Sequence, residues 1–218
     1  FAGPIQAAAS DADVFKARRE ALMEKLDGGV TVLYGANDAG GIVKGGFVQE
    51  SSFYYLTGVS EPGAALILAP GEHRYRETLY LQPRNPEIEN WDGRREPLGD
   101  ALNEALGFER VARTTALPYD LTAMLQRSKK AVFLGPIVSA TADVPDALGI
   151  LRDAQSRVPG TSLTNMADLI PEMRRIKDAQ EVEKIQQAIE RLEAGGSTNG
   201  GAGIALAYKT VEESFVEG

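Results

Sequence analysis

The chain has 218 residues and a formal net charge of −8 at pH 7. Its hydrophobic fraction of 43% and charged fraction of 25% are typical of a folded globular protein, and no stretch approaches the roughly 18 apolar residues that a membrane-spanning helix needs. The acidic balance argues against a nucleic-acid surface and favours small ligands or proteins as partners, and the absence of cysteine excludes disulfides, thiol nucleophiles and Cys-ligated zinc.

The first ten residues, FAGPIQAAAS (1–10), are interpreted as an N-terminal extension. Small-residue runs such as AAAS often flank cleaved secretory signals, but this stretch contains no Met, no basic segment and no apolar signal core. The compartment is therefore left open between the cytoplasm and export to the periplasm after signal removal.

A helix followed by a strand is predicted next. Side chains recur at helical spacing over residues 11–26, and two glycines follow directly. The stripe consists of Val14, Arg18, Leu22 and Leu26. The β-branched run VTVLYG (30–35) has the composition of a buried strand, and the GANDAGG stretch that begins at its last glycine favours a turn.

Residues 51–83 predict extended segments of one sheet. The aromatic stretch SSFYYLTG is interpreted as extended up to Gly58, which would send the rings of Tyr54 and Tyr55 to opposite faces, one into the core and one to the surface or an interface. After a turn at SEPG, AALILA has the composition of an apolar strand, and RYRETLYLQP (74–83) alternates polar and apolar residues at period two. We expect these strands to be neighbours in the sheet.

The second half of the chain adds helices around a further strand. Helical spacing predicts helices over 99–106, 118–125 and 144–158, and KAVFLG (130–135) predicts a short buried strand. The alternation of helices with strands indicates an α/β fold, and the hairpin-like steps in the middle indicate a mixed sheet. The predicted fold class is therefore α/β, with a mixed β-sheet and helices on both faces.

The C-terminal part opens with the clearest helical pattern, over residues 177–192. Asp178 and Glu181 have the spacing of a capping box at its start. The apolar stripe of this helix consists of Val182, Ile185, Ile189 and Leu192. Residues 195–218 follow as a Gly-rich segment that carries no core of its own.

Sequence signals for catalysis are weak. His73 is the only histidine and lies at an expected turn, and the chain contains no H-E-x-x-H, zinc spacing or Walker A motif. A Ser-His-Asp site and a dinucleotide site are not expected, because the histidine is poorly placed and GANDAGG lacks the G-x-G-x-x-G register. We assign no catalytic residue and no metal ligand. The paired arginines Arg18, Arg19, Arg174 and Arg175 are interpreted as solvated helix faces.

The loop PRNPEIENWDGRREP (83–97) is the strongest candidate for a functional segment. It is bounded by prolines, rich in charge and longer than an ordinary connection. It carries the only tryptophan, Trp91, whose indole either anchors the loop in the core or contacts a ligand or partner. Arg94 and Arg95 in the same loop can bind carboxylates bidentately.

Four stretches occur in an informative order: FKARREALMEKL (15–26), Gln49 with SSFYYLTGVSEPGAALIL (51–68), LYLQPRNPEIENWDGRRE (79–96) and MRRIKDAQEVEKIQQA (173–188). In this order they resemble the N-terminal domain of aminopeptidase P and prolidase, the creatinase-type "pita-bread" metallopeptidases. The resemblance covers the chain from residue 12 to residue 190. It divides the chain into the extension 1–10, a creatinase-like N-terminal domain 11–175 and a linker helix toward a catalytic domain 176–194. The last part is a Gly-rich tail, 195–218, which is interpreted either as the start of the C-terminal domain or as a remnant of it.

The resemblance implies an activity for the parent protein. Such enzymes remove the first residue from peptides with proline in the second position, or split Xaa-Pro dipeptides. Their hydrolysis uses two divalent ions, usually manganese, whose ligands lie in a C-terminal domain after the R-x-I-K-D helix. We therefore expect the parent protein to be a metallo-exopeptidase, and we expect this chain alone to be inactive and to hold no metal ion.

The resemblance also implies a role for the loop. In dimeric or tetrameric family members the tryptophan at this position helps to wall a neighbouring subunit's active site, so Trp91 is expected to contact substrate in trans, with Arg94 and Arg95 as supports. The expected partners are peptides with proline second and further copies of the chain, as a homodimer or homotetramer, with no nucleic acid and no membrane. Two alternatives stay open: a stand-alone interaction module with this fold, and the N-terminal domain of a creatinase-type amidinohydrolase.

Overall fold

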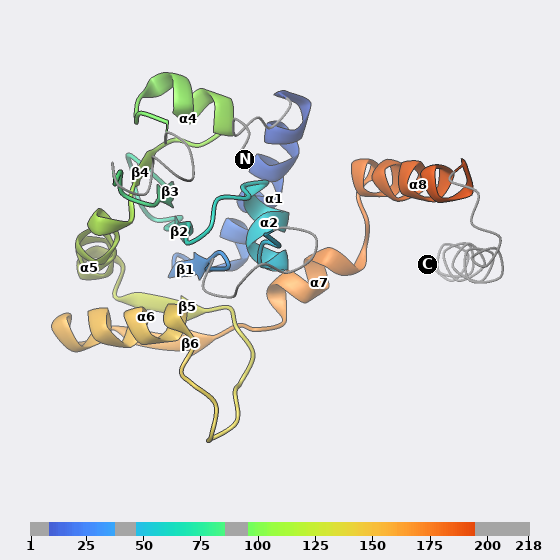
Figure 1. Cartoon of the computed structure of the whole chain (residues 1–218). Coiled ribbons are helices and arrows are strands. Elements are labelled where there is room, and N and C mark those ends of the chain that lie inside the picture. Colours follow the sequence, from blue (N-terminus) through green and yellow to red (C-terminus); the bar gives the residue numbers. More distant parts are fainter. Residues whose placement is uncertain (1–8, 38–46, 86–95, 195–218) are drawn as a thin grey trace. The chain divides into compact units, whose positions relative to one another are not determined.

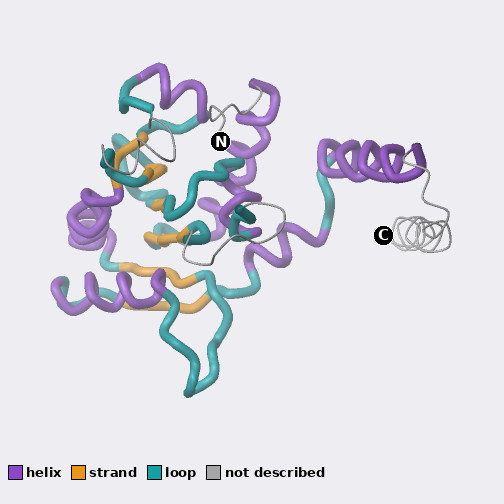
Figure 2. Tube along the Cα trace, viewed as in Figure 1, coloured by secondary structure: helices purple, strands orange, loops and turns teal. Residues whose placement is uncertain are grey.

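The computed structural model describes residues 9–37, 47–85 and 96–194 of the chain (Figure 1). The chain divides into two compact units, Phe1–Pro171 and Glu172–Gly218. The first unit contains a six-stranded mixed sheet with helices on both faces, which confirms the predicted fold class (Figure 2). No helix in the described ranges is long and apolar enough to cross a membrane.

The sheet contains one strand that runs against the others. The strands are β1 (Val30–Tyr34), β2 (Ala65–Leu68), β3 (Glu77–Leu81), β4 (Val111–Arg113), β5 (Lys130–Phe133) and β6 (Ser162–Asn165), in the spatial order β4-β3-β2-β1-β5-β6. β2 is antiparallel to both β1 and β3, whereas β3 and β4, β1 and β5, and β5 and β6 are parallel pairs. Five strands therefore end at the same edge of the sheet, which we call the carboxyl edge, and β2 begins there.

Apart from α1, which precedes β1, the helices named next lie between these strands in the chain. These helices are α1 (Ala9–Lys25), α2 (Ser51–Thr57), α4 (Asp100–Leu106), the short 3-10 helix η1 (Thr114–Ala116), α5 (Leu117–Ser128) and α6 (Asp146–Arg157). The helices predicted over 11–26, 99–106, 118–125 and 144–158 are confirmed, as are the strands predicted over 30–35, 74–83 and 130–135 and the AALILA strand. The sequence does not predict the strands β4 and β6, because three or four residues are too few to show the alternation of polar and apolar side chains that marks a strand.

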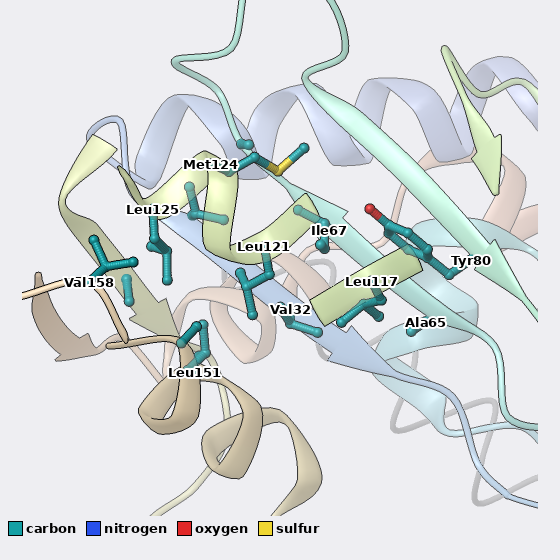
Figure 3. Close-up of a cluster of buried hydrophobic side chains, with 14 of the residues drawn as sticks. Val32, Ala65, Ile67, Tyr80, Leu117, Leu121, Met124, Leu125, Leu151 and Val158 are labelled. Carbon is teal, nitrogen blue, oxygen red and sulfur yellow. The ribbon is translucent and has the colours of Figure 1, made fainter. Parts of the chain in front are cut away.

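One face of the sheet is covered by α5 and α6 (Figure 3). α5 places Leu121 and Leu125, both fully buried, against the sheet, and α6 adds Leu151. The strands contribute Val30, Val32, Ala65, Ile67 and Tyr80 to this cluster. Burying a side chain of the size of leucine is worth about 1.5–3 kcal/mol, so these contacts account for much of the adhesion of α5 and α6.

The other face is covered by α1, which packs against α2 and α4 (Figure 1). Leu22 of α1, Leu26 directly after α1, and Phe53 and Leu56 of α2 are almost completely buried. Of the side chains predicted to form the stripe over residues 11–26, Leu22 and Leu26 are buried as expected. Val14 and Arg18 are only partly buried and lie beside this stripe.

The prediction that residues 51–57 are extended is wrong, because they form the helix α2. The Glu50 carboxylate accepts hydrogen bonds from the backbone N–H groups of Ser52 (3.0 Å) and Phe53 (2.6 Å), which caps the helix start. Gly58 ends the helix in the left-handed conformation, at φ 67°. Tyr54 and Tyr55 therefore do not lie on a strand, although Tyr55 is buried and Tyr54 is 45% exposed. The strand preference of aromatic residues is overridden here by the caps and by packing on α1.

The helix α7 (Leu169–Arg175) crosses the division between the units, and α8 (Ala179–Ala194) lies in the second. The predicted capping box of α8 is confirmed: the Glu181 N–H donates to Asp178 Oδ1 at 2.9 Å, and the Asp178 N–H donates to Glu181 Oε2 at 3.2 Å. The segment 195–218, predicted as a tail, lies outside the described residues. The predicted domain limits stay predictions.

Candidate functional site

The predicted site residues Trp91, Arg94 and Arg95 lie outside the described residues. The chain on both sides of them is described. Residues 82–85 leave the carboxyl edge directly after β3, and the chain is described again from Glu96. The candidate site is therefore the part of the carboxyl edge from which this loop departs and to which it returns.

Arg113, the last residue of β4, contacts both ends of the loop. Its Nη1 donates a hydrogen bond to the Gln82 carbonyl at 3.0 Å, and its Nη2 donates to the Glu96 carbonyl at 2.6 Å. β4 pairs with β3 so that Arg113 lies opposite Leu81, which brings the guanidinium to the departing end of the loop. One side chain thus links the two ends of the segment that carries Trp91.

Gln82 is itself fixed to the turn that precedes β2. Its backbone N–H donates to Glu61 Oε1 at 3.1 Å, and its Nε2 donates to the Gly63 carbonyl at 3.0 Å. A Cβ on Gly63 would lie 2.1 Å from Gln82 Nε2, and Gly63 has a φ of +64°. A side chain at position 63 would therefore be strained and would also displace Gln82.

Gln49 connects the same turn to the segment after β1. Its Oε1 accepts hydrogen bonds from the Ala36 N–H at 2.6 Å and from the Glu50 N–H at 2.9 Å. Its Nε2 donates to the carbonyls of Val59 at 3.2 Å and Glu61 at 3.1 Å. Both atoms of this amide are thus used to fix backbone, and the side chain is partly buried.

The side chains of Gln49, Glu61, Gln82 and Arg113 form a connected set, which we call the loop-base network. It holds residues on both sides of 38–46 and on both sides of 86–95. All four side chains are partly buried, and their bonds here go to backbone groups. Such an arrangement positions loops at the carboxyl edge, which is where open α/β sheets ordinarily bind ligands.

The prediction that Arg19 lies on a solvated helix face is wrong, because Arg19 is completely buried. Its guanidinium forms a bidentate ion pair with Glu77 of β3, with distances of 2.6 Å and 3.1 Å, and donates to the Leu56 carbonyl at 3.0 Å. It also donates to the Gly107 carbonyl and lies 3.9 Å from the ring centroid of Phe108. The pair joins α1 to β3 and to the chain around α2 and α4.

The other paired arginines give a mixed result. Arg18 is partly buried, with its guanidinium 4.2 Å from the ring centroid of Tyr55 and a hydrogen bond to the Tyr55 carbonyl at 3.1 Å, so the solvated interpretation is wrong for it. Arg174 is partly buried and Arg175 is exposed, as predicted for Arg175.

A second polar cluster lies where β3 meets α5. Tyr80 Oη donates to Asp120 Oδ2 at 2.8 Å, and Arg110 Nη1 donates to the same oxygen at 2.8 Å. Burial raises the pKa of Tyr80, and the Asp120 charge and hydrogen bond raise it further. Tyr80 therefore stays protonated and acts as a fixed donor.

Within residues 9–37, 47–85 and 96–194, no group of three or more His, Cys, Asp or Glu side chains is arranged to hold a metal ion. The donor set of the described residues therefore does not fit a two-metal centre. His73 is exposed and lies in a bend between β2 and β3.

Taken together, these features define an open mixed α/β domain with a loop-positioning network at its carboxyl edge. The chain belongs to the family described as "Aminopeptidase P, N-terminal domain", whose model matches residues 15–133.

Curated relatives agree with this assignment. The Xaa-Pro aminopeptidase of Haemophilus influenzae is 33% identical over 147 residues, which cover 65% of this chain and 31% of the relative. The Xaa-Pro aminopeptidase of Escherichia coli is 30% identical over 185 residues, which cover 81% of this chain and 41% of the relative. The chain thus spans about a third of the length of the curated relatives it matches.

Solved structures agree in fold. Pseudomonas aeruginosa aminopeptidase PepP matches with a TM-score of 0.67 at 25% identity, covering 85% of this chain and 42% of that one. The low-pH form of Escherichia coli aminopeptidase P matches with a TM-score of 0.67 at 23% identity, covering 82% of this chain and 42% of that one.

Proposed function

We propose that this chain is the N-terminal domain of a metal-dependent Xaa-Pro aminopeptidase and that it breaks no bond itself. Its role is to shape the access of peptide substrates with proline in the second position and to contribute to a homodimer or homotetramer. The observation that carries this proposal is the family match over residues 15–133. It is supported by the fixed ends, at the carboxyl edge, of the loop that is the candidate for substrate contact.

In this proposal, Trp91 contacts the substrate of a neighbouring subunit, with Arg94 and Arg95 beside it. An indole offers a large rigid apolar face on which a proline ring can pack, and a tryptophan flanked by charged residues suits a surface that is covered only in a complex. The loop-base network supports this role, because fixed ends reduce the freedom that the loop would lose on binding.

The two divalent ions, manganese in our proposal, are placed outside the described residues, because the side chains there do not supply a ligand set. When bound, such ions activate a water for attack on the scissile carbonyl. The contribution of this chain is then confined to binding, orientation and assembly.

The Xaa-Pro peptidase is preferred over the creatinase-type amidinohydrolase because the curated relatives reported above carry the name Xaa-Pro aminopeptidase. The stand-alone interaction module differs from both in a measurable way. A protein of that kind would show no Xaa-Pro hydrolysis in any assembly or with any divalent ion.

The test is the substitution Trp91→Ala in the full-length protein, assayed with manganese on peptides of increasing length. We expect kcat/KM on Xaa-Pro peptides longer than the dipeptide to fall about 30-fold, the effect of losing a central contact residue of about 2 kcal/mol. The melting temperature should change little. The control is Tyr119→Ala, since Tyr119 is an aromatic residue of α5 that is 79% exposed.

A collapse of the melting temperature in Trp91→Ala would restore the alternative that the indole anchors the loop in its own core. An unchanged kcat/KM would refute the substrate contact. Light scattering of the same protein tests the assembly, and a monomer that hydrolyses Xaa-Pro peptides normally would contradict the contact in trans.

A further inference from the structure

We propose that the strand β6 is an interaction surface for a second copy of this chain, whose own β6 pairs with it antiparallel about a two-fold axis. β6 is the last strand of the sheet, so one of its two sides lies away from β5 (Figure 1). We call this side the free side of β6. The inference rests on the proposed function in so far as that function includes a homodimer or homotetramer.

The free side carries backbone groups that can bond to another strand. On the side of β5, the Ser162 N–H donates to the Lys129 carbonyl at 2.9 Å. In a parallel pair of strands every second residue bonds to the same neighbour, so the N–H and C=O groups of Leu163 and Asn165 face away from β5. In the part of the chain that the structure describes, β5 is the only strand that pairs with β6.

The strand at the opposite border of the sheet, β4, is protected against such pairing. It has three residues, ends in Arg113 and directly follows Arg110. Its Val111 N–H, which faces away from β3, already donates to Asn103 Oδ1 of α4 at 3.0 Å. Short length, charged side chains and a covered backbone are the usual protections of a border strand. Of the two borders, β6 is therefore the one that is suited to pairing.

The segment around β6 also lacks charge. Residues 158–167 contain no Asp, Glu, Lys or Arg, although the chain as a whole has a net charge of −8. Two copies with this charge repel each other over much of their surfaces, so an uncharged strand is a place where they can approach closely. The side chains of Ser162, Thr164 and Asn165 are polar and exposed, so they are not used by the core of their own domain.

The free backbone groups decide which residues face each other. Antiparallel strands exchange hydrogen bonds between residues whose N–H and C=O groups both face the partner strand. With Thr164 on the two-fold axis, Leu163 of one copy faces Asn165 of the second copy, and the two exchange a hydrogen bond in each direction. The axis generates the same pair of bonds a second time, and Thr164 faces Thr164 of the second copy.

The neighbouring registers use the free side less well. With Leu163 on the axis, Asn165 faces Thr161, whose carbonyl already accepts a hydrogen bond from Gln155 Nε2 at 2.7 Å. With Asn165 on the axis, Leu163 faces Ala167, where the chain turns toward α7. The register centred on Thr164 is therefore the one that uses both free residues of each copy.

This register also brings opposite charges together. It places Asp168 of the second copy at the start of β6, opposite Gly160. Lys129 lies at this point, with its Nζ 3.5 Å from the Pro159 carbonyl. Lys129 and Asp168 are both exposed, and neither forms an ion pair among the described residues. The two charges are therefore complementary across the axis, which favours this orientation of the copies.

The test places charges on the axis of the full-length protein, by Thr164→Lys and Thr164→Glu. Each variant alone sets two like charges directly opposite each other, so the mass from light scattering should fall to half that of the parent. The dissociation constant should rise about 30-fold or more. An equal mixture of the two variants should restore the parent's mass, because opposite charges then meet. Thr164 is exposed in the single chain, so the variants should still fold.

The matched control is Thr115→Lys, since Thr115 is an exposed residue of η1, directly after the protected strand β4. It should leave the mass unchanged. Asn165→Pro is a second variant, which removes an N–H that faces away from β5 and is therefore compatible with the strand. We expect it to raise the dissociation constant on the order of tenfold, and it serves as the test if Thr164→Lys does not fold.

The inference is overturned if the parent is a monomer, if Thr164→Lys keeps the parent's mass, or if the mixture does not restore it. A monomer whose β6 amides are protected from hydrogen exchange by an added Xaa-Pro peptide would assign the free side to a peptide instead. If the charged variants separate the copies but the protein hydrolyses no Xaa-Pro peptide with any divalent ion, the inference stands and the proposed function fails. If the protein hydrolyses these peptides as an oligomer that Thr164→Lys leaves intact, the inference alone fails.

Discussion

Arg19 and Arg113 are the same kind of side chain used in two opposite ways. Arg19 of α1 is completely buried, pairs with the Glu77 carboxylate and donates to two carbonyls. Arg113 lies partly exposed at the carboxyl edge and donates to the carbonyls of Gln82 and Glu96. Every position around the guanidinium of Arg19 is occupied by protein, whereas water can replace the contacts of Arg113.

The difference teaches how burial decides what an arginine contributes. A buried charge left without its partner is costly, so the loss of Arg19 alone or of Glu77 alone should destabilise the domain strongly even if the pair adds little net stability. A partly exposed guanidinium at the carboxyl edge can be removed at small cost to the fold, because water can take over its hydrogen bonds to the two carbonyls. Substitutions can test this contrast directly.

The largest effect is expected for Arg19→Met. This change leaves the Glu77 carboxylate, which is 2% exposed, without its buried counter-charge, and we expect it to lower the free energy of unfolding by about 3–5 kcal/mol. Urea unfolding of the chain measures this value. The exposed ion pair of Arg127 provides the control, since Arg127→Met should change the free energy of unfolding by less than about 1 kcal/mol.

The double variant Arg19→Met, Glu77→Leu sharpens the test. If the cost of Arg19→Met arises from the unpaired carboxylate, removing that carboxylate should recover most of the lost stability, because apolar residues often replace a buried ion pair without loss. A double variant less stable than Arg19→Met would instead attribute the cost to packing.

A smaller effect is expected for Gln49→Ala. Gln49 belongs to the loop-base network, as Arg113 does, but its side chain binds four backbone groups, whereas that of Arg113 binds two. Removing the amide leaves the Ala36 N–H and the carbonyls of Val59 and Glu61 without these partners, and we expect a loss of about 1–3 kcal/mol. Gln126→Ala on the exposed surface of α5 is the control. If Gln49→Ala lowers the free energy of unfolding no more than Gln126→Ala does, the hydrogen bonds of Gln49 do not stabilise the domain as proposed.

The smallest effect is expected for Tyr80→Phe, at about 1 kcal/mol, because Asp120 keeps its bond to Arg110. The pKa of Tyr80 is raised in the folded state above its ordinary value of 10.0, so the folded state retains a proton that the unfolded state releases. The stability contributed by this group is thus present below pH 10 and is lost as the pH rises above it. Melting curves from pH 8 to about pH 11 should show the advantage of the parent over Tyr80→Phe shrinking with pH. A constant difference would contradict the assignment.

The sequence patterns predicted the architecture well and the site incompletely. Long helices and apolar strands repeat a period often enough to be recognised, but the sequence of α2 predicts a strand, because its aromatic residues favour strands and one capping residue, Glu50, is a weak signal for a helix start. The prediction that Arg19 is solvated is wrong although the sequence contains a signal: Arg19 lies four residues after Phe15 and three before Leu22, on the apolar stripe itself. An arginine in such a stripe implies a buried partner.

The loop-base network could not have been derived from one sequence. Trp91 stands out in the sequence as a rare residue in a charged loop, whereas the contacts of Arg113 with Gln82 and Glu96 depend on the pairing of β4 with β3. Gln49 and Gln82 belong to stretches that carry the family resemblance, but they are separated along the chain from each other and from Arg113, and no local pattern indicates that the three lie close together. Long-range strand pairing creates their contacts, and a local pattern does not report it.

The strand order also bears on how the domain folds. The antiparallel pairs β1–β2 and β2–β3 join segments that are close in the chain, so their contacts form at a low cost in loop entropy. β5 pairs with β1 across a long intervening stretch, with Ala131 opposite Val30, and β6 can add only after β5. Contacts between distant segments form slowly. Folding is therefore expected to start from β1, β2 and β3 and to end with the docking of β5 and β6, so the slow kinetic phase should report the second half of the sheet.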